Sequence, residues 1–109
     1  MFTSMTTTDS LYSTPGEILK EEFMEPLGIS NYRLAKAIGV SETAVGEIIK
    51  GKRGISVAMA HRLSRAFGIT PEFWMNLQRD YEIFTFDPSV LEGIPNLNPQ
   101  PPFPEPVTE

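Results

Sequence analysis

Three basic side chains lie close together near the middle of the chain, at Lys50, Lys52 and Arg53 in the run KGKR. Ammonium and guanidinium groups at this density are suited to contacting the oxygens of phosphate groups. The same residues would need no special role if they only kept a surface turn solvated. The segment before them therefore decides between a phosphate-binding loop and an ordinary basic turn.

That segment, residues 31–49, is predicted to form two short helices joined by a tight turn. Apolar residues recur at helical spacing in each half, at positions 34, 35 and 38 and at positions 45, 48 and 49. Gly39 stands where the first helix must end, and Ser41 is suited to cap the second. The pattern of Ala35, Gly39 and Val45 resembles the helix-turn-helix of phage-repressor-like (Cro/CI-type) proteins. A plain pair of antiparallel helices is the alternative.

The resemblance implies that the second helix enters a major groove of DNA, and the charge distribution agrees. Residues 29–66 carry seven Lys and Arg against two Glu, whereas the rest of the chain carries two basic and twelve acidic residues. A net charge of −5 argues against a generic nucleic-acid binder. This sorting nevertheless places the positive charge on the helix-turn-helix unit, so double-stranded operator DNA is the expected partner.

The resemblance also implies roles for the exposed positions around the second helix. We expect base contacts from Glu42, Thr43, Ala44, Gly46 and Glu47. We expect phosphate contacts from Asn31, Tyr32, Arg33, Lys50, Lys52 and Arg53. For Tyr32 and Arg33, covering the second helix is an equal alternative.

The expected recognition helix lacks the side chains that read bases best. It holds no Arg, Lys, Asn or Gln before Lys50, although bidentate base contacts usually come from those residues. Glu42 can accept a hydrogen bond from cytosine, and the methyl group of Thr43 can meet that of thymine. Gly46 offers no side chain and weakens the helix by about 1 kcal/mol. We therefore expect a modest sequence preference.

Composition excludes several other functions. The 109 residues contain no cysteine and one histidine, His61, so neither a metal site, a cofactor nor a thiol nucleophile is expected. The sequence contains neither a pair of acids placed for catalysis nor a phosphate-binding glycine loop, so nothing in it indicates an enzyme. No apolar run approaches the length of a membrane span, and the start of the chain lacks a signal-peptide core. A cytoplasmic protein is expected.

Along the chain, the patterns predict an all-α domain of five helices at residues 14–86. Thr14, Ser30, Ser41, Ser56 and Thr70 are the expected N-caps. Residues 1–13 are expected to be a flexible arm. Residues 87–109 contain seven prolines and no basic residue, which disfavours helix and strand. This Pro-rich tail is expected to be a solubilising or packing segment. Its PxxP spacings leave a recognition motif as the alternative.

Aromatic residues recur along the predicted fifth helix, at Phe73, Trp74, Tyr81 and Phe84. Helical spacing favours a core or a dimer contact over a ligand pocket. Because a core of about 70 residues is marginal, we expect a homodimer in which Trp74 or Tyr81 helps to bury the interface.

Longer motifs narrow the resemblance. The runs TPGEILKEEFMEPLGIS, RLAKAIGVS, GKRGIS and TPEFWMNLQRDYEI are similar to those of HigA (VapI) antitoxins, over residues 14 to about 84. That family implies an operator-binding dimer that represses its own operon and inhibits a RelE-like ribonuclease toxin. Two other readings stay open: a solitary regulator without a toxin, and a toxin-inhibiting interaction module with little specific DNA binding.

Overall fold

The computed structural model describes residues 13–98, in which all regular structure is helical. The expected N-terminal arm, apart from Ser13, and residues 99–109 of the tail lie outside this range. The described elements are α2 (Pro15–Ile18), the π-helical η1 (Leu19–Met24), α3 (Glu25–Leu27), α4 (Asn31–Ile38), α5 (Glu42–Ile49), α6 (Val57–Phe67), α7 (Pro71–Thr85) and the 3-10 helix η2 (Pro88–Leu91). α2, η1 and α3 follow one another without a break and form one continuous helical segment. The predicted all-α fold is confirmed.

Local hydrogen bonds begin each helix where the sequence predicts. Thr14 forms a capping box: its hydroxyl accepts from the Glu17 N–H at 3.1 Å, and its own N–H donates to the Glu17 carboxylate at 3.1 Å. The hydroxyls of Ser30, Ser41, Ser56 and Thr70 each accept from the backbone N–H three residues on and so cap α4, α5, α6 and α7. Gly39 ends α4 with a φ of 76°, a left-handed conformation that favours glycine.

Two proline-containing segments form local helical structure. Pro26 and Gly28 are together expected to end the first helix, and the structure places its end at Gly28, with Pro26 still inside the helix. A π turn directly precedes this proline, and the Glu25 N–H there donates to the Lys20 carbonyl five residues back. In the tail, Pro88–Leu91 form a 3-10 turn because the Asp87 carboxylate accepts from the Ser89 N–H at 3.0 Å.

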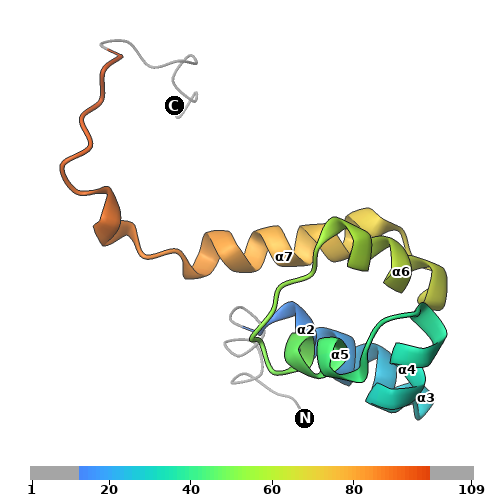
Figure 1. Ribbon diagram of the computed structural model, residues 1–109. Helices are drawn as coiled ribbons and strands as arrows, with labels where there is room; N and C mark the ends of the chain where they lie inside the picture. The colour runs from blue at the N-terminus through green and yellow to red at the C-terminus, as the bar shows by residue number, and fades with distance from the viewer. Residues whose placement is uncertain (1–12, 99–109) are drawn as a thin grey trace, which may run out of the picture.

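The helices pack around one apolar core, and α7 extends beyond it (Figure 1). α4 packs on α5 and α6, whereas α7 packs on α6 and α2. The C-terminal half of α7 projects past the other helices, and the segment after it continues away from them (Figure 1). In residues 13–98, no helix is both long enough and apolar enough to cross a membrane.

Trp74 lies at the centre of this core, with none of its surface exposed. Its ring centroid is 4.9 Å from that of Phe23 and 5.0 Å from that of Phe73. The prediction that Trp74 lies at a dimer interface is therefore wrong, because its side chain is fully buried in the core of a single chain. Tyr81 is half-buried and Phe84 is 60% exposed, so the aromatic residues of α7 become more exposed towards its C-terminal end.

A close backbone contact fixes α5 against the first helix. A Cβ atom at Gly16 would lie 1.8 Å from the carbonyl oxygen of Ile48, a distance that no side chain tolerates. Gly16 is buried, and Ile48 is 2% exposed. Only glycine lets α2 meet the last turn of α5 at this distance.

Replacing Gly16 with Ala should therefore lower the free energy of unfolding by about 3 kcal/mol or more, because the two backbones must separate. Urea unfolding followed by circular dichroism measures this. Gly46→Ala is the matched control: its nearest neighbour, the Asn31 amide nitrogen, is 3.9 Å away, so this variant should gain up to about 1 kcal/mol. Equal unfolding midpoints for the wild type and Gly16→Ala would contradict the contact.

Candidate nucleic-acid interface

A hollow of about 360 Å³ lies between the start of α4 and the outward face of α5. Its lining residues are Asn31, Glu42, Thr43, Gly46, Glu47, Lys50 and Lys52. Each of these residues was predicted from the sequence to contact DNA. The structure thus brings seven of the eleven predicted residues onto one surface.

Ala44 does not share this surface, contrary to prediction. It is 7% exposed and lies on the inward side of α5 with Val45 and Ile48. Positions 44 and 48 stand one helical turn apart, so both face the core. The Ala44 methyl group is therefore unavailable to a thymine.

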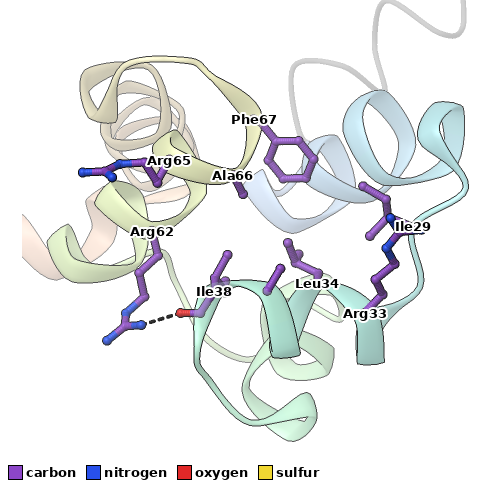
Figure 2. A pocket seen from close by; sticks show the side chains of 9 residues that line it. Ile29, Arg33, Leu34, Ile38, Arg62, Arg65, Ala66 and Phe67 are labelled. Carbon is purple, nitrogen blue, oxygen red and sulfur yellow. Dashed lines mark hydrogen bonds between the residues drawn. The ribbon is translucent and has the colours of Figure 1, made fainter.

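Tyr32 and Arg33 also lie outside the hollow. The Tyr32 ring is exposed, and the Lys36 ammonium lies 5.8 Å from its centroid, within range of a cation–π contact. Arg33 lines a separate pocket between α4 and α6 (Figure 2). The structure does not group these two side chains with the other predicted phosphate contacts.

Glu47 organises the basic loop after α5. Its carbonyl oxygen accepts from the N–H groups of Lys52 and Arg53, at 2.9 and 3.3 Å. Its carboxylate accepts from the Arg53 guanidinium at 2.7 Å and 3.1 Å. This pair is partly exposed, so it adds little stability, but it compensates one of the two acidic charges on the outward face of α5. Within the described residues, Glu42 has no ion pair and keeps its charge uncompensated.

Gln78 on α7 anchors the far end of the same loop. Its side-chain oxygen accepts from the buried N–H of Ile55 at 2.8 Å, and its amide nitrogen donates to Glu82 at 2.7 Å. Gly54 passes directly over this amide, because a Cβ atom there would lie 2.8 Å from the Gln78 nitrogen. The basic loop is thus held at both ends, by α5 and by α7.

Sequence reasoning missed three residues that position this interface: Gly54, Arg62 and Gln78. Gln78 stands one turn after Trp74 on the apolar face of α7, which was a usable signal for a buried polar anchor. The Arg62 guanidinium donates to the Ile38 carbonyl at the end of α4, next to the turn into α5 (Figure 2). No local pattern marks either that contact or the approach of Gly54, because both partners are distant in the sequence.

Two short helices joined at Gly39, the second with a polar outward face beside a basic loop, define a helix-turn-helix unit. A family described as "Helix-turn-helix" matches residues 20–74, about half of the chain. The chain belongs to this helix-turn-helix family.

Named relatives agree with this assignment. The chain is 45% identical over 69 residues to "Virulence-associated protein I" of Dichelobacter nodosus, covering 63% of this chain and 64% of that protein. It is 44% identical over 70 residues to "Antitoxin HigA-1" of Vibrio cholerae, covering 63% and 65%. The chain thus spans slightly less than two thirds of the length of these curated relatives.

A solved structure shares the fold as well. "Pseudomonas aeruginosa antitoxin HigA with higBA promoter" is 42% identical, with a TM-score of 0.69 over 73% of this chain and 86% of that one. At 42% identity, the two proteins share sequence as well as fold.

Replacing Gln78 with Leu should lower the free energy of unfolding by about 1–3 kcal/mol, because the buried Ile55 N–H loses its acceptor. The Ile55 amide proton should also exchange faster with solvent, as measured by hydrogen exchange. Arg79→Leu is the matched control on the same helix, because Arg79 is exposed and pairs with its neighbour Asp80. Unchanged protection of the Ile55 amide in Gln78→Leu would show that this anchor does not hold the loop.

Proposed function

We propose that this protein is a HigA-type antitoxin: a homodimer that binds operator DNA, represses its own operon and neutralises a toxin. The observation that carries the DNA part is the hollow on α5, which seven of the residues expected to contact DNA line together. Its support is the similarity to an antitoxin whose structure was solved with promoter DNA.

Phosphate groups are the proposed ligands of the rim of this hollow. Lys50 and Lys52, both exposed, line it at and after the end of α5, and Asn31 lines it at the N-terminus of α4. Helix N-termini favour anions because their first N–H groups point outward. Arg53 is bound to Glu47 in the free protein, so it reaches a phosphate only by exchanging that carboxylate for another oxygen ligand.

Base contacts are proposed for the centre of the hollow. The Glu42 carboxylate accepts a hydrogen bond from a cytosine amino group, and the Thr43 methyl group packs against a thymine. Gly46 leaves room for a base edge, since no atom outside its own helix lies closer than 3.9 Å to its missing Cβ. Glu47, tied to Arg53, contributes less. Much of the sequence preference then comes from groove shape.

The proposed dimer follows from DNA geometry and from the size of the core. Helix-turn-helix proteins bind two half-sites about one helical turn apart, which matches a two-fold protein. Residues 13–98 hold thirteen buried apolar residues, and so small a core gains from covering further apolar surface. This role places the protein in the cytoplasm with its operator.

The proposed toxin is a RelE-like ribonuclease. Its support is the similarity to "Antitoxin HigA-1" and the acidic segments on either side of the helix-turn-helix unit. Acidic residues suit a basic, RNA-cleaving partner because opposite charges steer association.

The DNA proposal predicts a specific salt dependence. Lys50→Ala and Lys52→Ala together should weaken binding to the chain's own promoter and to unrelated DNA alike. The slope of log K against log salt should shrink by about 0.9 for each lost phosphate contact. Fluorescence anisotropy at several salt concentrations measures both quantities. Lys20→Ala is the control, because Lys20 is exposed on the first helix and lies outside the hollow.

A slope that the Lys50→Ala, Lys52→Ala double variant leaves unchanged would remove the basic loop from the interface. Glu42→Gln separates operator recognition from general attraction, since it deletes a negative charge and keeps the shape. If Glu42 reads cytosine, this variant loses preference for the promoter over unrelated DNA. A uniform rise in affinity would instead exclude a base contact by Glu42.

The toxin part predicts that the neighbouring gene encodes a small basic protein that is toxic alone and harmless when expressed with this chain. Growth assays test the rescue, and co-purification tests the complex. Promoter binding without rescue would favour a solitary regulator. Rescue without promoter binding would favour an interaction module that has lost specific DNA binding.

A further inference from the structure

A pocket of about 430 Å³ opens between α4 and α6, away from the hollow on α5 (Figure 2). Leu34, Ile38 and Phe67 supply part of its apolar lining. Pockets of this size are large enough to enclose apolar side chains of a ligand. The cavity shares no lining residue with the hollow, and Arg33 is the one residue expected to contact phosphate that lines it.

Three arginines line the same pocket, at Arg33, Arg62 and Arg65, and no acidic residue does. Arg62 is held in place by the Ile38 carbonyl, which accepts a hydrogen bond from one of its nitrogens (Figure 2). The remaining guanidinium donors are suited to carboxylates, which they can bind with two parallel hydrogen bonds. The pocket therefore fits a ligand that is both apolar and acidic.

The same chain carries a segment of that chemistry after α7. Phe86, Val90, Leu91 and Ile94 are all about half exposed or more, with Leu91 the least at 49%. Asp87 and Glu92 lie among them, and residues 80–98 contain no Lys or Arg. Hydrogen bonds from the backbone N–H and the hydroxyl of Ser89 lower the pKa of Asp87, so this carboxylate stays charged at neutral pH.

The segment does not reach the pocket of its own chain in this structure. α7 carries it away from α4 and α6, and its path continues outward (Figure 1). A run of exposed apolar residues of this length is typical of an interaction site. A second copy of the chain brings both complementary features together.

We propose that residues 86–97 of one protomer dock in the α4–α6 pocket of a second copy, apolar side chains inward and carboxylates on the arginines. The exchange is reciprocal, because each protomer has one segment and one pocket, and it closes into a two-fold dimer. This inference deepens the dimer part of the proposed function by naming its surface. It is tested without DNA or toxin, so its failure is distinguishable from the failure of operator binding.

Crosslinking between two single-cysteine chains tests the docking directly, because the protein has no cysteine of its own. Ala66 lines the pocket, and Leu91 lies in the segment. Ala66→Cys and Leu91→Cys chains, mixed and treated with a short bis-maleimide, should give a covalent heterodimer identified by its mass. Ala58→Cys replaces Ala66→Cys in the control, because Ala58 is exposed on α6 outside the pocket.

Preferential linkage of position 91 to position 66 supports the proposal. No linkage, or equal linkage to positions 58 and 66, overturns it. In a chain with both Ala66→Cys and Leu91→Cys, a link within one monomer also overturns it, since the segment would then fold onto its own pocket.

Sedimentation gives an independent measurement on the otherwise unmodified chain. Arg65→Glu should weaken dimerisation by about tenfold or more, as expected when an ionic contact becomes a repulsion. Arg79→Glu makes the same charge change on α7, outside the pocket, and should leave the dimer unaffected. A dimer that Arg65→Glu leaves unchanged uses another surface, which overturns the docking and leaves the dimer itself intact.

Discussion

The approach of Gly16 to the carbonyl of Ile48 sets the position of the helix that faces DNA in our proposal. The contact joins two backbones, so there is no side chain between them that could adjust to a change. α5 is therefore located by the first helix on one side and by α4 on the other. The hollow on its outer face is a consequence of that placement, since the seven lining residues come from two stretches of chain, the start of α4 and residues 42–52. Rigid placement of this kind lets short side chains such as Thr43 contribute to recognition.

The electrostatics of the interface reflect a balance between attraction and selectivity. Two lysines and two glutamates line the same hollow, and one of the glutamates is already bound to Arg53. In our proposal, a polyanion is attracted by the lysines and meets the carboxylate charge of the glutamates. Such an arrangement penalises misplaced DNA more than well-placed DNA, because only a correctly presented amino group compensates a carboxylate. Weak general affinity is then compatible with useful discrimination.

Features encoded by neighbouring residues could be predicted from the sequence, whereas features that depend on packing could not. Helix starts were predicted correctly, since a cap such as Ser41 bonds to a backbone group three residues away. Ala44 was wrongly predicted to be exposed, because the sequence indicates the helix but not which of its faces turns towards the core. Trp74 was assigned to an interface for the same reason. Gln78 and Ile55, 23 residues apart, were not paired at all, because no local pattern links a glutamine to a distant loop.

The bond between Gln78 and Ile55 has a thermodynamic implication for any molecule that binds the C-terminal half of α7. Gln78 also donates to Glu82, so a ligand that engages Glu82 acts on the side chain that holds the basic loop. Suppose such a ligand changes the affinity of the loop for DNA by some factor. Reciprocity then requires DNA to change the affinity of that ligand by the same factor. In that case, the binding of operator DNA and the binding of the ligand to α7 would be thermodynamically coupled.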